Sequence, residues 1–220
     1  MINRVIVIEY RFILEKEKRR QNMNSNIIPL IIFDTETNGL TIECSVLSIS
    51  AIKVFYDLDK KIFLKEFETY DRYYYVKEGE VENKDAICVN GLTREEITRR
   101  RKGANYPKFF YDDIESFKKF CSETRHFIAH NIKFDLKYIE KYIDVPNTFD
   151  TMAENRYIMK LPSSYGYKNP RLSETAEFYN IDVSCYSFHS SLDDVKVTAK
   201  VFRKMCKNNE KSVLMFLNLK

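Results

Sequence analysis

Two carboxylates stand two positions apart after an apolar run, and this pair limits the fold more than any other feature of the chain. The run at residues 31–33 predicts a buried β-strand, and Asp34 and Glu36 follow it directly. Side chains alternate faces along a strand, so these two carboxylates point the same way. Like charges held side by side repel unless a cation lies between them, and hard divalent cations prefer oxygen ligands. The pair therefore predicts half of a metal site on one face of a sheet.

The composition is that of an ordinary globular protein with a substantial core. The 220 residues are 44% hydrophobic and 31% charged, and only 5 Gly and 5 Pro argue against long disordered linkers. The 5 cysteines are widely spaced and never form a C-x-x-C pair, so neither a disulfide framework nor a zinc site is expected. No apolar run is long enough to span a membrane, and the charged amino terminus does not resemble a signal peptide. We expect a cytoplasmic protein without a membrane partner.

The positive charge is unevenly distributed. The formal net charge is +4, and residues 1–22 supply most of it, with six basic and three acidic side chains. This balance does not indicate a tight, sequence-independent DNA binder. A second basic run at residues 99–102 is typical of a solvated face, with a phosphate contact as the alternative.

Hydrophobic periodicity predicts one α/β domain between two short appendages. Residues 1–27 are an N-terminal extension, either a partner-binding helix or a frayed tail, and translation starting at Met23 is an alternative. Residues 208–220 are a short C-terminal tail whose apolar patch at 213–217 is expected to pack on its own domain, with docking to a partner as the alternative. Strands are expected at 30–34, 46–56, 62–70 and 126–130, and helices at 112–122, 132–143, 151–159, 172–179 and 192–206. This order predicts a mixed sheet covered by helices over residues 28–207.

Two further stretches carry carboxylates that, taken one at a time, are typical of structural roles. Asp135 falls on the flank of an apolar helical stripe. It could be a solvated residue, a partner of the helix dipole or a metal ligand. His189 precedes Asp194 by five residues. Ser191 could be the N-cap of the following helix, with Asp194 in the capping-box position.

Taken together, these motifs resemble those of the DEDDh exonucleases, the DnaQ-like enzymes of the RNase H-like superfamily that include proofreading epsilon-type subunits. The matching stretches are Phe33 to Leu40, His130 to Asp135 and His189 to Asp194, with weaker similarity in Asn90-Gly91-Leu92-Thr93, Asp150-Thr151 and residues 198–202. Ser48 departs from the pattern, since many members carry Glu there, and the stretch 99–111 is longer than usual. The resemblance implies a mixed five-stranded sheet flanked by helices.

The resemblance also implies a reaction and the residues that carry it. Asp34, Glu36, Asp135 and Asp194 would hold two Mg²⁺ or Mn²⁺ ions, and His189 would complete the catalytic set as general base. The enzyme would hydrolyse nucleic acid in the 3′-to-5′ direction and release nucleoside 5′-monophosphates. His126 and His130 flank a short buried strand and are expected to be structural.

The expected substrate is the 3′ end of single-stranded DNA or RNA, with DNA favoured. Substrate-binding positions implied by the resemblance are Thr37, Asn38, Gly39, Leu40 and Asn131, with Leu40 as an apolar wedge. A DNA polymerase subunit is one candidate partner, which would give a proofreading or repair role. The alternatives are an RNA-directed exoribonuclease and, from another class, a non-catalytic nucleic-acid-binding or polymerase-accessory module. The oligomeric state is left open.

Overall fold

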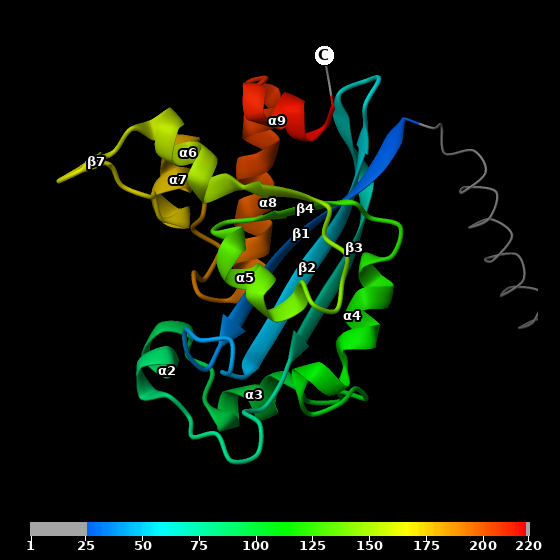
Figure 1. Ribbon diagram of the computed structural model, residues 1–220, viewed down its shortest axis with the longest axis vertical. Coiled ribbons are helices and arrows are strands. Elements are labelled where there is room, and N and C mark those ends of the chain that lie inside the picture. The colour runs from blue at the N-terminus through cyan, green and yellow to red at the C-terminus, as the bar shows by residue number, and fades with distance from the viewer. Residues whose placement is uncertain (1–25, 219–220) are drawn as a thin grey trace, which may run out of the picture.

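A five-stranded sheet forms the centre of the computed structural model, which describes residues 26–218. The spatial order is β3-β2-β1-β4-β5 (Figure 1). The strands are β1 (Ile27–Thr37), β2 (Val46–Asp57), β3 (Ile62–Tyr73), β4 (His126–Ala129) and β5 (Asn147–Asp150). Strands β1, β2 and β3 are antiparallel neighbours, whereas β4 pairs parallel to both β1 and β5. The predicted α/β fold with a mixed five-stranded sheet is confirmed.

Helices cover both faces of this sheet (Figure 1). Helices α4 (Ile114–Cys121) and α5 (Ile132–Ile139) pack on one face, and α7 (Leu172–Phe178), α8 (Ser191–Lys207) and α9 (Lys211–Phe216) on the other. Strand β1 is buried between the two cores: Leu30 and Ile32 point toward α8, and Ile31 and Phe33 toward α4 and α5. The period of two along a strand then directs the even-numbered positions that follow toward the α8 face.

The remaining elements lie around this frame. Helices α2 (Lys84–Asn90) and α3 (Arg94–Arg100) sit beyond the carboxyl end of β1 (Figure 1), and a 3-10 turn η1 (Phe110–Asp112) precedes α4. Helix α6 (Thr151–Met159) follows β5 directly, and a small hairpin of β6 (Pro162–Ser163) and β7 (Gly166–Tyr167) connects it to α7. None of the helices within residues 26–218 is long and apolar enough to cross a membrane.

Side-chain caps explain where several elements begin. The Asn83 side chain accepts a hydrogen bond from the N–H of Asp85 (2.9 Å) at the start of α2, and Asp150 accepts one from Met152 (2.9 Å) at the start of α6. Asp57 accepts an N–H bond from Lys60 (2.9 Å) in the turn between β2 and β3. These polar residues satisfy backbone donors that the regular elements leave unpaired.

Three expectations differ from the structure. Ser191 is not an N-cap: Ser190 holds that position, and Ser191 is the first residue of α8. The helix expected over 132–143 ends at Ile139, and α2, α3 and α9 were not predicted because their apolar periodicity is short. The C-terminal patch does pack on its own domain, since α9 buries Val213 and Leu217 follows it into the same core.

The domain boundaries at 27/28 and 207/208 stay predictions. Residues 1–25, including the basic segment and Met23, lie outside the described part of the chain, as do residues 219–220.

Candidate active site

Asp34 and Glu36 lie near the end of the central strand, on the face covered by α8. Asp34 is opposite Ser50 on β2 and Glu36 is opposite Ser48, and the register shifts just after Glu36. Both acidic side chains are half-buried. The Oδ2 atom of Asp34 is buried and has no hydrogen-bond partner among residues 26–218. A buried, unsatisfied carboxylate oxygen is costly, and a bound cation is one way to satisfy it.

Asp135 reaches the same strand from α5. The chain turns from β4 into α5 through Asn131, which adopts the left-handed conformation (φ 74°). Asp135, only 2% exposed, accepts hydrogen bonds at Oδ1 from the backbone N–H (2.9 Å) and the hydroxyl (2.7 Å) of Thr35. Thr35 lies between the first two carboxylates, so Asp135 is fixed beside them rather than on a solvated flank.

Asp194 and His189 enter from the start of α8. His189 has a left-handed backbone (φ 65°), and its N–H donates to Asp194 Oδ2 (3.0 Å). The other Asp194 oxygen, Oδ1, is buried without a hydrogen-bond partner in the described chain. Ligand atoms of Glu36, His189 and Asp194 all lie within 4.8 Å of one another. The structure thus brings together all five residues that the three motifs supply.

The four carboxylates disfavour each other's ionisation. Burial raises the pKa of Asp34 well above its ordinary value, and the nearby charges of Asp135, Glu36 and Asp194 raise it further. Burial, then Asp194 and Asp135, raise the pKa of Glu36 to about 8.

The other two carboxyls shift in the same direction. Burial raises the pKa of Asp135 to about 7 even though the Thr35 bonds favour its charged form, and burial raises the pKa of Asp194 to about 7. Divalent cations would neutralise this charge and satisfy the two orphaned oxygens, so the donor set fits a metal centre.

A chain of buried hydroxyls holds the start of α8 against the sheet. The Ser191 hydroxyl lies 2.9 Å from that of Ser48 and 2.7 Å from that of Ser50, and Ser50 donates to Asp71 (2.7 Å). A hydroxyl carries one hydrogen, so Ser191 donates to Ser50 and accepts from Ser48. Because the Ser191 hydroxyl is used in these bonds, it does not cap the helix. Ser48, opposite Glu36, donates to Ser191 and so helps to hold the first turn of α8, which carries Asp194.

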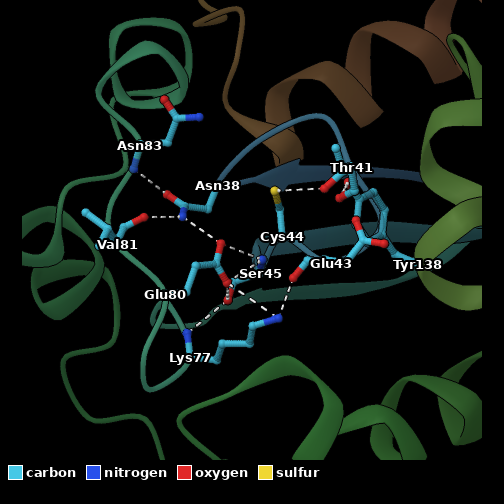
Figure 2. Close-up of polar contacts among 10 residues, drawn as sticks. All are labelled: Asn38, Thr41, Glu43, Cys44, Ser45, Lys77, Glu80, Val81, Asn83 and Tyr138. Atoms are coloured by element: carbon cyan, nitrogen blue, oxygen red, sulfur yellow. Dashed lines mark hydrogen bonds and ion pairs between the residues drawn. The ribbon is translucent and has the colours of Figure 1, made fainter.

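The loop after β1 is held by a polar network that the sequence did not reveal (Figure 2). The Asn38 amide donates to Glu80 (2.7 Å) and to the Val81 carbonyl (2.9 Å), and its oxygen accepts from the N–H of Asn83 (2.8 Å). Glu80 also accepts from the hydroxyl of Ser45 (2.7 Å). These bonds tie residues 38–45 to the segment before α2, and Asn38 is only 3% exposed.

The predicted substrate-binding positions therefore differ in what they can offer. The Thr37 hydroxyl donates to the Gly39 carbonyl (2.6 Å), so the side chains of Thr37 and Asn38 are engaged within the protein. A Cβ on Gly39 would lie 2.7 Å from Cys44 Sγ, so only glycine fits there without a shift. Leu40 is 78% exposed, and Asn131 is exposed at the start of α5. Of the five predicted positions, Leu40 and Asn131 are the ones whose side chains are exposed in the described chain.

Asn90 is a site residue that motif reading alone did not single out. Its amide donates to the Thr37 carbonyl (3.1 Å), and its side chain favours the ionised form of Glu36. The available signal was the Asn90-Gly91-Leu92-Thr93 stretch.

The two other histidines are structural, as expected. His130 lies 3.0 Å from the Thr151 hydroxyl and 3.1 Å from the Pro170 carbonyl, and the His126 ring packs against Phe216. Burial lowers the pKa of both histidines, so each favours the neutral form.

The basic run also has intramolecular partners. Arg99 and Arg100 both donate to Glu96 (2.7 and 2.6 Å), and Arg101 donates to the Tyr106 carbonyl (2.9 Å). These contacts favour a structural and solvated face over a phosphate site.

A mixed sheet with four carboxylates and a histidine gathered at the end of its central strand defines the RNase H-like class of exonuclease fold. The chain belongs to the RNase T family, described as an exonuclease, whose model matches residues 31–202. The predicted membership of an exonuclease family is confirmed, and the solved structures that share the fold include a DEDDh family member.

Sequence relatives include two bacterial DNA polymerases. The PolC-type DNA polymerase III of Caldanaerobacter subterraneus subsp. tengcongensis is 28% identical over 182 residues, which cover 80% of this chain and 11% of the polymerase. DNA polymerase I of Aquifex aeolicus is 32% identical over 102 residues, covering 42% of this chain and 18% of the polymerase. The chain thus spans less than a fifth of the length of either relative.

Solved structures share the fold at low sequence identity. The nuclease domain of 3′hExo, a DEDDh family member bound to rAMP, has a TM-score of 0.55 at 15% identity, covering 83% of this chain and 92% of that one. The cell-death related nuclease CRN-4 has a TM-score of 0.58 at 14% identity, covering 82% and 64%.

Proposed function

We propose that this protein is a metal-dependent exonuclease that removes nucleotides one at a time from the 3′ end of single-stranded nucleic acid. The observation that carries the proposal is the meeting of Asp34, Glu36, Asp135 and Asp194 from three separate elements, with His189 beside two of them. A purely structural cluster has no need for four mutually repelling carboxylates.

The acidic residues fit a pair of divalent ions, for which Mg²⁺ and Mn²⁺ are the candidates. Asp34, Glu36, Asp135 and Asp194 would hold them. When bound, two such ions supply charge stabilisation to the attacking and leaving oxygens of an in-line displacement. The chain's own contribution is to hold the four carboxylates at fixed positions, through Thr35 for Asp135 and the His189 N–H for Asp194.

His189 supplies the proton acceptor. It is exposed at the mouth of the cluster, and its ring lies close to Glu36 and Asp194. An imidazole nitrogen in this position can take a proton from the attacking water. The water oxygen bonds to the phosphorus of the terminal phosphodiester, and the bond from that phosphorus to the 3′ oxygen of the preceding nucleotide breaks. A nucleoside 5′-monophosphate leaves, and the 3′ oxygen takes up a proton from solvent.

Leu40 supports a preference for an unpaired end. Its side chain stands largely in solvent beside the site, on a loop fixed by Asn38 and Glu80. An apolar side chain on a rigid loop can contact terminal bases without reading their sequence.

DNA is the favoured polymer, because the sequence relatives named above are DNA polymerases. An RNA-directed activity is the second candidate, since a 3′-exonuclease that recognises the histone mRNA stem-loop shares the fold. A proofreading or repair role beside a polymerase follows only from the first candidate. Removal of a mispaired 3′ nucleotide faster than a paired one would support that role.

The decisive experiment uses 5′-labelled single-stranded DNA and RNA with Mg²⁺, Mn²⁺ or chelator. The Asp34→Ala variant tests the site, and Asp144→Ala, at an exposed position, is the matched control. We expect a ladder that shortens from the 3′ end and disappears with chelator and with Asp34→Ala only. Degradation that survives Asp34→Ala would mean that the cluster is not the catalytic centre. An intact site without any activity would instead favour a non-catalytic binding module.

A further inference from the structure

A basic groove of about 480 Å³ lies over the exposed face of α8, away from the carboxylate cluster. One side is the hairpin between β2 and β3, and the other is the segment that follows α7. The hairpin stands at the opposite end of the sheet from α2 (Figure 1). Its charged lining residues are Lys61, Asp182, Lys200, Arg203, Lys204 and Lys207.

The groove gathers positive side chains on one part of the described surface. Five cations and one carboxylate give it a local charge of +4, equal to the formal net charge of all 220 residues. Among the ion pairs formed by the side chains that the structure describes, none includes any of these five cations. Such a field attracts a polyanion strongly and is screened by salt.

The cations form a row along α8, the helix whose first turn carries Asp194. Lys200, Arg203, Lys204 and Lys207 stand at positions i, i+3, i+4 and i+7, so they share one face of the helix. Asp194 lies on the same helix. Lys207 follows it by thirteen residues, which corresponds to about 20 Å along the helix axis at about 1.5 Å per residue. At about 3.4 Å per stacked nucleotide, roughly six nucleotides cover that length.

One loop joins the two regions. Tyr186 belongs to the segment that also carries His189, and the Lys200 ammonium lies 4.5 Å from the centre of the Tyr186 ring. Residues 186–189 therefore run from the edge of the groove to the catalytic cluster.

We propose that this groove binds the phosphate backbone of the substrate strand on the 5′ side of the nucleotide being removed. The inference rests on the proposed function, which places a nucleic-acid 3′ end at the start of α8. The Phe63 ring in the groove is already covered by Arg203 (4.9 Å) and Tyr56 (4.9 Å). The contact is therefore with phosphates rather than by base stacking, and it does not depend on sequence.

The test compares substrate length, with catalysis on a short strand as the internal control. Single strands of about 3 and about 15 nucleotides are hydrolysed by the wild-type protein and by an Arg203→Gln/Lys204→Gln/Lys207→Gln variant. Binding of the long strand is measured separately by fluorescence anisotropy in chelator over a range of salt concentrations. The matched control replaces Lys108, Lys118 and Lys119 by Gln, three exposed lysines on and before α4, on the opposite face of the sheet.

We expect the groove variant to bind the long strand about tenfold more weakly at low salt, with a salt slope shallower by about 2, because about 0.7 counterions are released per phosphate contact. Its KM should rise for the long strand only, with kcat on both strands and KM on the short strand unchanged. The control variant should match the wild type. If the triple variant does not fold, Lys204→Glu/Lys207→Glu gives the same reading.

An unchanged affinity and salt slope for the long strand would overturn the proposal and leave an acidic protein segment as the occupant to seek. Absence of hydrolysis on both lengths would refute the proposed function, whereas the groove is still decided by the binding measurement alone.

Discussion

Removing one charge from the carboxylate cluster should stabilise the metal-free protein at alkaline pH. The pKa of Glu36 is raised from 4.5 to about 8, chiefly by burial and then by Asp194 and Asp135. Ionising this side chain in the folded protein therefore costs about 4–5 kcal/mol more than in the unfolded chain. Between pH 4.5 and about 8 the folded state binds more protons than the unfolded state, so the free energy of unfolding falls as pH rises through that window.

The Glu36→Gln substitution removes this charge and keeps the shape of the side chain. The other carboxylates share the repulsion, so we expect the single change to recover about 2–4 kcal/mol at pH 8, or about 5–15 °C in Tm for a chain of this size. At pH 5 Glu36 is already protonated in the folded protein, and the two proteins should differ by less than about 1 kcal/mol.

The assay is thermal unfolding followed by circular dichroism, in chelator at both pH values. Glu78→Gln, at an exposed position, is the matched control and should leave Tm unchanged. Added Mn²⁺ should raise Tm of the wild-type protein more than that of Glu36→Gln, because the variant has one ligand charge fewer. A Glu36→Gln protein that is no more stable than the wild type at pH 8 in chelator would refute the electrostatic reasoning.

Three further substitutions test separate parts of the site. His189→Gln should lower kcat by about 10²–10⁴-fold while metal-induced stabilisation is retained, and an unchanged kcat would exclude His189 as the base. Ser191→Ala removes a hydrogen-bond partner from two buried hydroxyls and should lower the free energy of unfolding in urea by about 1–3 kcal/mol. It should also weaken Mn²⁺ binding, because Asp194 is displaced. A loss of stability without weaker Mn²⁺ binding would mean that Ser191 has a structural role only. Gly39→Ala places a Cβ 2.7 Å from Cys44 Sγ and should lower the free energy of unfolding by about 1–3 kcal/mol. A second change, Cys44→Ala, should recover most of this loss. If the effects of the two substitutions on the free energy of unfolding simply add, the steric explanation is wrong.

The sequence by itself determined the residues of the cluster and the class of the fold. Alternation along a strand is a local property, so Asp34 and Glu36 could be assigned to one face from their spacing alone. Helical periodicity located most of α5 and α8, and with them Asp135 and Asp194. Short helices such as α2 carry too few apolar positions for periodicity to show.

Only the tertiary structure decided how these residues are held and what surrounds them. The bond from Thr35 to Asp135 joins positions 100 residues apart, and the contact of Ser48 with Ser191 spans 143. Such pairings depend on how helices pack on the sheet, which no local spacing encodes. Packing also directs the Asn38 side chain inward to Glu80. It brings the cations of α8 beside the β2–β3 hairpin, where together they line a groove. The spacing of the carboxylates identified the chemistry, and long-range packing determined the pKa values of the site, the rigidity of its loop and the surface along which a substrate can lie.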